Sequence, residues 1–164
     1  MILIVVDTGP INYLIQIGHI DLLSTLADKT VLPSSVRAEL LNDAAPANVR
    51  AWAANPPGWV EIHAAKQVIG TRDISGTDRE AIVLGRELNA SFLLMDDQQA
   101  RRCASALGVI TLGTLGLLEA AAARGLVSLP AALEKLRRTS FFVTDELIEA
   151  ALQRDTERRR RQPT

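Results

Sequence analysis

Short apolar runs alternate with helical segments along this chain, and that order constrains its fold more than any other feature. Residues 2–6 are an unbroken run of β-branched and aliphatic side chains, which is typical of a central strand buried on both faces of a parallel sheet. Residues 91–95 and 109–112 are similar runs. The repeated order of strand and helix predicts an α/β sandwich of three layers, with a mainly parallel central sheet flanked by helices.

Helical periodicity and turn residues place the other elements. Further strands are expected at 30–32 and 59–62, and helices at 11–17, 21–27, a segment ending at 41, 48–54, 77–89, 98–107, 114–124, 130–138 and from 145 onward. Ser34 or Ser35 can cap the helix that ends at residue 41. Thr77 can cap the helix at 77–89, with Glu80 at the capping-box spacing. The loop at 66–76 is expected to be the most flexible segment.

Length and charge predict one globular domain with a basic end. The 164 residues, 48% of them hydrophobic, suffice for a single core, which we expect within residues 1–153. Residues 154–161 hold five Arg and two acids, whereas the rest of the chain has 13 basic and 17 acidic residues. The segment at 154–164 is therefore predicted to be a basic tail. A solvated terminus is its first interpretation, and a phosphate-contacting arm is the alternative.

Cysteine and histidine are too scarce for several kinds of site. Cys103 is the single cysteine, which excludes an internal disulfide, and His19 and His63 give little basis for a zinc site. The apolar N-terminal run lacks a basic segment before it and is shorter than the core of a signal peptide. No stretch of the sequence approaches the length of a membrane span. We expect a cytoplasmic protein without membrane contact.

Carboxylates follow two of the predicted buried strands. Asp7 ends the first apolar run, and Asp96 and Asp97 end the run at 91–95. In open α/β sheets, ligands bind beyond the carboxyl ends of the strands, so these acids are candidates for a site. Glu39 and Asp78 lie on helices that begin just after such edges.

A single acid of this kind is commonly a helix cap, a turn residue or a solvated side chain. Several carboxylates at one rim, however, repel one another, and a divalent cation removes that repulsion. Oxygen ligands without cysteine favour Mg²⁺ or Mn²⁺ over zinc. Such a site can orient a phosphodiester and activate a water molecule without a nucleophilic side chain.

Other enzyme classes lack their motifs in this sequence. There is no convincing Ser-His-Asp set, no Gly-x-Ser-x-Gly elbow, and neither a dinucleotide-binding nor a Walker A glycine loop. A haloacid dehalogenase needs a second Asp where Gly9 stands. The Gly-Thr-Leu-Gly segment at 113–116 is too short for a phosphate loop and is assigned to strand-to-helix packing.

Four segments, in this order and at these spacings, resemble the motifs of PIN domains. They are Asp-Thr-Gly-Pro-Ile-Asn-Tyr-Leu at 7–14, Pro-Ser-Ser-Val-Arg-Ala-Glu-Leu at 33–40, Gly-Thr-Asp-Arg-Glu-Ala-Ile at 76–82 and Leu-Leu-Met-Asp-Asp at 93–97. The stretches at 100–108, 113–118 and 124–126 are similar to a prokaryotic subgroup close to the VapC toxins. The resemblance extends to about residue 152.

The resemblance implies an endoribonuclease that depends on Mg²⁺ or Mn²⁺ and hydrolyses RNA with metal-activated water. Such proteins are often homodimers and often the toxin of a toxin–antitoxin pair, so a cognate antitoxin protein is an implied partner. The metal-site roles fall by position on Asp7, Glu39, Asp78 and Asp96. Thr8 and Asn12 would be supporting polar groups near the metal or phosphate.

Several alternatives remain open in the sequence. Glu80 competes with Asp78 as a ligand, because the subgroup that the sequence resembles tends to carry acids at both positions. Asp97 competes with Asp96, because the register of the last acid of the family is poorly fixed. Neighbouring side chains of a strand point to opposite faces, so at most one of Asp96 and Asp97 should face the metal. Residues near the motifs that could meet phosphates, although arginine is usually solvated, are Arg37, Arg72, Arg79, Arg101 and Arg102. A PIN fold kept only for binding another protein, or a nuclease directed at DNA, are the alternative functions.

Overall fold

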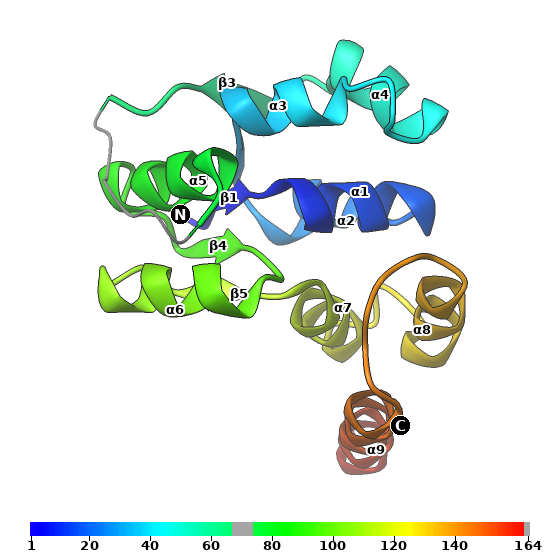
Figure 1. Cartoon of the computed structure of the whole chain (residues 1–164). Helices are drawn as coiled ribbons and strands as arrows, with labels where there is room; N and C mark the ends of the chain where they lie inside the picture. The colour runs from blue at the N-terminus through cyan, green and yellow to red at the C-terminus, as the bar shows by residue number, and fades with distance from the viewer. Residues whose placement is uncertain (67–73, 163–164) are drawn as a thin grey trace. The chain divides into compact units, whose positions relative to one another are not determined.

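The computed structural model describes residues 1–66 and 74–162 (Figure 1). Most of the loop expected at 66–76, including Arg72, lies outside the described residues. The described chain forms two compact units, residues 1–114 and 115–164. The first unit contains the sheet and all the candidate acids.

A parallel sheet lies at the centre of the first unit. Within the described residues it has five strands, in the order β3-β2-β1-β4-β5, and every pairing is parallel. Their bounds are β1 Leu3–Val6, β2 Lys29–Pro33, β3 Val60–His63, β4 Phe92–Leu94 and β5 Thr111–Leu112. All the residues of β1 are buried, as the apolar run predicts for a central strand. The sheet and its flanking helices confirm the α/β fold class.

The helices of the first unit agree with the predicted order, with shifted ends. Their bounds are α1 Thr8–Gln16, α2 Leu22–Leu26, α3 Ser34–Leu40, α4 Ala47–Ala54, α5 Gly76–Glu87 and α6 Gln98–Ala106. Helix α1 begins at Thr8, three residues before the predicted start. Gly9 and Pro10 lie before the predicted start, but proline is tolerated in the first turn of a helix, where its missing N–H leaves no hydrogen bond unmade.

Two of the predicted helix caps are wrong. Helix α5 is capped by Ser75, whose hydroxyl accepts a hydrogen bond from the Asp78 amide at 3.0 Å, rather than by Thr77. Pro33 occupies the N-cap position of α3, so Ser34 already lies inside the helix and its side chain is not the cap. The first turn of α3 therefore needs a hydrogen-bond acceptor from elsewhere in the fold.

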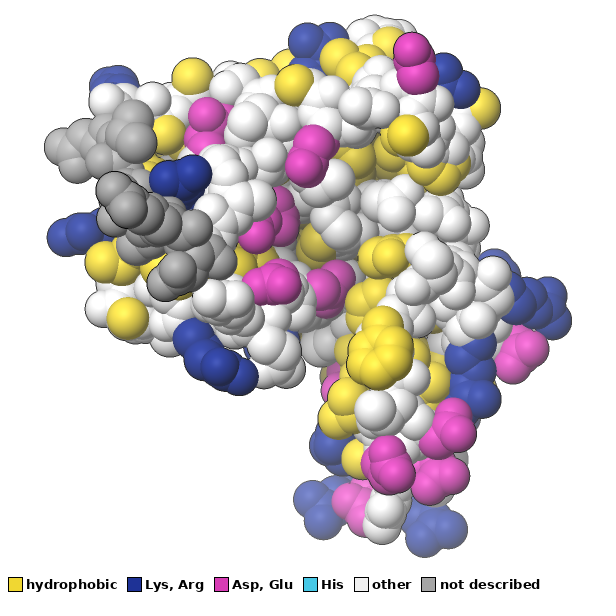
Figure 2. All heavy atoms as spheres, viewed as in Figure 1, with side chains coloured by type: hydrophobic (Ala, Val, Ile, Leu, Met, Phe, Trp, Pro, Cys, Tyr) yellow, Lys and Arg dark blue, Asp and Glu magenta, His cyan; other side chains and the backbone are white. Residues whose placement is uncertain are grey.

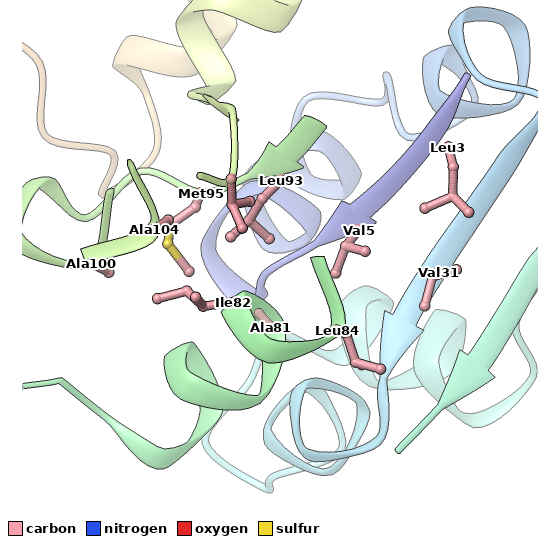
Figure 3. Packing of buried hydrophobic residues seen from close by; sticks show 11 residues of the cluster. Leu3, Val5, Val31, Ala81, Ile82, Leu84, Leu93, Met95, Ala100 and Ala104 are labelled. Atoms are coloured by element: carbon pink, nitrogen blue, oxygen red, sulfur yellow. The ribbon is translucent and has the colours of Figure 1, made fainter. Parts of the chain in front are cut away.

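The core of the first unit lies between the sheet and the helices α5 and α6 (Figure 3). Leu3 and Val5 of β1 pack there with Ile82 and Leu84 of α5. Because side chains alternate along a strand, the other two residues of β1 face the opposite side of the sheet, and they are buried as well. Because both faces of β1 are covered, the strand lies in the middle of the sheet, and the residue that follows it stands at the carboxyl edge of the sheet.

The second unit is helical. It contains most of α7 Thr114–Ala123, together with α8 Leu129–Arg137 and α9 Asp145–Arg161, and α8 packs against α9. The segment expected as a basic tail is helical as far as residue 161, because α9 runs through it. The division into a nuclease domain and a tail stays a prediction. None of the described helices is long and apolar enough to cross a membrane.

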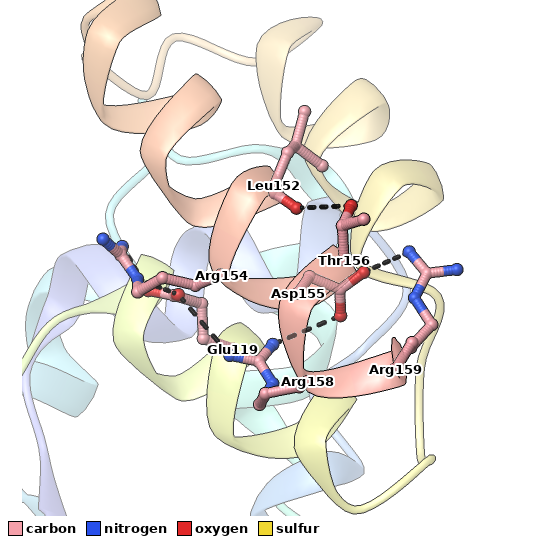
Figure 4. Close-up of polar contacts among 7 residues, drawn as sticks. All are labelled: Glu119, Leu152, Arg154, Asp155, Thr156, Arg158 and Arg159. Carbon is pink, nitrogen blue, oxygen red and sulfur yellow. Dashed lines mark hydrogen bonds and ion pairs between the residues drawn. The ribbon is translucent and has the colours of Figure 1, made fainter. Parts of the chain in front are cut away.

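Acids in the second unit hold several of the basic side chains of α9 (Figure 4). Arg154 donates to both carboxylate oxygens of Glu119, at 2.8 and 3.1 Å. Asp155, only 4% exposed, accepts hydrogen bonds from Arg158 and Arg159. Three of the five arginines counted in the sequence are therefore engaged within the unit, which favours a structural role for them.

Candidate acidic site

Asp7 lies at the carboxyl end of β1 and at the N-cap position of α1. Its backbone N–H donates to the carbonyl of Leu94 at 3.0 Å, which ties it to the neighbouring strand β4. An aspartate at this position usually caps its helix by accepting a hydrogen bond from the amide of the second or third helical residue, but the side chain of Asp7 makes no such capping bond. The residue is only 6% exposed, and its Oδ1 has no hydrogen-bond partner within the described part of the chain.

The surroundings of Asp7 change the pKa of its carboxyl group. The pKa of this carboxyl is raised from 3.8 to about 8, and burial is the largest cause. The negative charge of Asp78, a hydrogen bond with Asp78 and the charge of Glu39 contribute to the increase, whereas a hydrogen bond from the Thr8 backbone opposes it. The structure thus brings Asp7, Asp78 and Glu39 within electrostatic range of one another.

Glu39 is tied to the start of α1. The hydroxyl of Thr8, the residue after Asp7, donates a hydrogen bond to the carboxylate of Glu39. This bond connects α3, which carries Glu39, to the residue next to Asp7. Asn12 is placed differently, since its side-chain oxygen accepts a hydrogen bond from Gln16 at 2.9 Å, one turn along α1.

Asp78 and Glu80 lie on the same helix but face different neighbours. Asp78 acts on Asp7. Glu80 Oε1 accepts hydrogen bonds from the Ser34 hydroxyl at 2.8 Å and from the Ser35 amide at 3.1 Å. In this geometry Asp78 is the ligand candidate of the two.

Asp96 and Asp97 also separate. Asp97 caps α6, because its Oδ1 accepts a hydrogen bond from the Ala100 amide at 2.8 Å. Asp96 instead accepts two hydrogen bonds from Thr114, and its Oδ2 lies 3.8 Å from where a Cβ on Gly9 would stand. Asp96 is therefore near the first turn of α1, the helix that follows Asp7.

The environment of Asp96 has opposing effects on its charge. Burial raises the pKa of Asp96, whereas the Thr114 hydrogen bonds and the positive charge of Arg101 lower it. A Cβ at Gly113 would come within 3.1 Å of Asp96 Oδ1 and 3.2 Å of an Arg101 nitrogen. Gly113 and Thr114 were assigned only to strand-to-helix packing from the sequence, but Thr114 also holds this acid by two hydrogen bonds and Gly113 leaves room for it. Their place directly after a predicted strand, at the same sheet edge as Asp96, is the signal that could have indicated it.

The donor set fits a hard divalent cation. Within residues 1–66 and 74–162, no group of three or more His, Cys, Asp or Glu side chains is close enough together to hold a metal ion as it stands. The unpartnered oxygen of buried Asp7 and its repulsion by Asp78 and Glu39 are what a cation would relieve. Acidic side chains gather on the face of the first unit seen in Figure 2, with basic ones toward its margins. Carboxylate oxygens of this kind suit Mg²⁺ or Mn²⁺.

Two other features of the first unit lie apart from these acids. A pocket of about 440 Å³ is lined by none of the candidate ligands, and its lining residues are His63, Ala64, Lys66, Leu84, Glu87 and Leu88. Arg37, a candidate phosphate contact in the sequence, donates to the carbonyl of Ala53 at 2.9 Å and so joins α3 to α4. Arg101, in contrast, stands beside Asp96.

Comparisons with known proteins agree with this architecture. A PIN-domain family model (DUF3368) matches residues 3–157. A PilT N-terminus domain protein from the hyperthermophilic archaeon Sulfolobus solfataricus P2 is similar in fold, with a TM-score of 0.54 and 18% sequence identity over 73% of this chain and 92% of that chain. No curated protein matches the sequence. PIN domains are commonly nucleases and generally use divalent metal ions. Since the family model covers nearly the whole sequence and the parallel sheet agrees with it, this chain belongs to the PIN-domain family.

Proposed function

We propose that this protein is an endoribonuclease that depends on Mg²⁺ or Mn²⁺ and hydrolyses RNA phosphodiesters. The observation that carries the proposal is the buried carboxylate of Asp7, which has an unpartnered oxygen and stands against two further acids. A buried charge without a partner is costly, and acids are seldom gathered in this way without a positively charged ligand.

Asp7, Asp78 and Glu39 would hold the cation, and Asp96 would complete the site from the segment that follows β4. When bound, the cation supplies the positive charge that activates water and stabilises the departing oxygen of a phosphodiester. Thr8 keeps the Glu39 carboxylate next to Asp7. Thr114 keeps Asp96 directed by two hydrogen bonds, so that acid needs no reorientation when substrate arrives.

Cleavage assays with two Asp→Asn variants test the proposal. Single-stranded RNA and DNA of the same sequence are incubated with the wild type, with Asp7→Asn and with Asp97→Asn, in Mn²⁺, in Mg²⁺ and in EDTA. Asp97→Asn is the matched control, because asparagine caps a helix as well as aspartate does. We expect metal-dependent cleavage of RNA by the wild type and by Asp97→Asn, and none by Asp7→Asn.

The other outcomes each name a different function. Cleavage of DNA in preference to RNA would replace the ribonuclease by a DNA-directed nuclease. Full activity of Asp7→Asn would show that the site is misassigned. No cleavage of either polymer, together with no stabilisation by Mn²⁺, would favour a PIN fold kept for binding another protein.

We extend the proposal to a VapC-like toxin that acts in the cytoplasm as a homodimer and is restrained by an antitoxin. Induced expression in a bacterial host should then arrest growth, and Asp7→Asn should abolish the arrest. Light scattering should report two copies per particle. Growth that continues during wild-type expression, with the protein soluble and active on RNA, would contradict the toxin role.

A further inference from the structure

We infer that Glu80 is a positioning residue: it fastens helix α3 to helix α5 and thereby sets where Glu39 and Asp78 stand around Asp7. The inference rests on the proposed function of the acidic site. It assigns Glu80 a role distinct from that of a metal ligand, although the residue lies only two positions after Asp78.

The contact itself replaces a missing helix cap. Helix α3 begins after Pro33, whose side chain cannot accept a hydrogen bond. A single oxygen of Glu80, Oε1, accepts from the Ser34 hydroxyl at 2.8 Å and from the Ser35 amide at 3.1 Å. A side chain from α5 thus satisfies the first turn of α3, which otherwise has an unpaired amide. Hydrogen bonds of a backbone amide and a hydroxyl to a carboxylate are stronger than neutral ones.

The two helices joined in this way carry two of the three acids that surround one another. Asp78 on α5 shares a hydrogen bond with Asp7, and Glu39 on α3 accepts a hydrogen bond from Thr8, the residue after Asp7. The starts of α1, α3 and α5 are therefore linked in pairs. Asp7 and Asp78 link α1 to α5, and Thr8 and Glu39 link α1 to α3. The hydrogen bonds of Glu80 link α3 to α5.

The acids themselves do not link α3 to α5. Glu39 on α3 and Asp78 on α5 are both carboxylates, and like charges tend to separate the two helix starts rather than join them. The hydrogen bonds of Glu80 oppose that separation from outside the cluster. The chain then loses less conformational freedom when the cation binds.

Binding of Mn²⁺ to the whole chain, measured by isothermal titration calorimetry well below each unfolding temperature, tests the inference. The variants are Glu80→Ala, Glu80→Gln and Ser34→Ala. Glutamine retains a side-chain oxygen that can accept both hydrogen bonds, but it carries no charge. Ser128→Ala is the control, since it removes the cap of α8 in the second unit and leaves the acids untouched.

We expect Glu80→Ala to weaken Mn²⁺ binding by about 10- to 100-fold, as loss of a group that supports metal ligands typically does. Ser34→Ala should weaken binding in the same direction, Glu80→Gln should bind almost as well as the wild type, and Ser128→Ala should lower only the unfolding temperature. If Glu80→Ala does not fold, the contrast between Glu80→Gln and Ser34→Ala decides.

Three results would overturn the inference. Glu80→Ala with a lower unfolding temperature but an unchanged Kd would leave Glu80 as a helix cap only. Weak binding by Glu80→Gln with normal binding by Ser34→Ala would make Glu80 a ligand. A wild type that binds no Mn²⁺ would refute the proposed function, and the role of Glu80 with it.

Discussion

Asp96 and Thr114 are joined by two hydrogen bonds, each 2.7 Å long, one from the threonine amide to Oδ1 and one from its hydroxyl to Oδ2. Both carboxylate oxygens are thus held by one residue, at the first turn of α7. The acid that ends one strand of the sheet is therefore directed by the residue that follows the next strand.

Replacing Thr114 with valine should lower the free energy of unfolding by about 1.5–3 kcal/mol, the usual contribution of a hydrogen bond to a charged group. Valine has nearly the same shape and keeps the backbone amide, so only the hydroxyl contact with Asp96 Oδ2 is lost. Urea unfolding measures the change. Thr114→Ser keeps the hydroxyl and should retain most of the stability; a loss in Thr114→Ser with none in Thr114→Val would mean that the threonine methyl group matters instead.

Alanine at Gly113 should also destabilise the protein, by about 1–3 kcal/mol, because overpacking forces neighbouring groups to move. The new Cβ would stand 3.1 Å from Asp96 Oδ1 and 3.2 Å from an Arg101 nitrogen. Gly58→Ala is the matched control, since nothing lies within 4 Å of a Cβ there. Thermal unfolding of the two variants should differ clearly, and equal unfolding temperatures would contradict the close approach.

The stability of the metal-free protein should fall as pH rises from about 4 to about 8. Unfolded, Asp7 releases its proton near pH 3.8, whereas its folded pKa is about 8. Between these values the folded state binds more protons than the unfolded state, so the free energy of unfolding decreases with increasing pH. Urea unfolding in EDTA across this range measures the slope. Asp7→Asn should flatten it, and an unchanged slope in that variant would assign the effect to another group.

Asp155→Asn should weaken the second unit by about 1–3 kcal/mol, since two guanidinium groups would lose a carboxylate that is nearly inaccessible to water. Glu157→Gln removes the same charge from an exposed position of α9 and serves as the control. Thermal unfolding should separate the two variants. Similar small effects would show that the contacts of Arg158 and Arg159 contribute little.

The sequence predicts those parts of the fold that depend on burial. The apolar run that precedes Asp7 specifies a strand covered on both faces, and this places the acid at the carboxyl edge of the sheet. The alternation of strands and helices then determines that Asp96 lies at the same edge, because parallel strands end together.

Choices between neighbouring polar residues could not be predicted in this way, because they depend on contacts between distant segments. Residues two apart on a helix do not face the same way, so Asp78 and Glu80 meet different partners, but periodicity does not say which one meets Asp7. Ser75 and Thr77 are both residue types that cap helices, and packing against distant segments decides where α5 begins.

A carbon-13 NMR titration of the Asp7 carboxyl, without metal and with saturating Mg²⁺, tests the central claim most directly. In EDTA the carboxyl should titrate near pH 8, because it is buried beside Asp78 and Glu39. With Mg²⁺ its midpoint should fall by several units, since the cation favours the ionised form. A midpoint near 4 in EDTA, or one that Mg²⁺ leaves unchanged, would contradict the account.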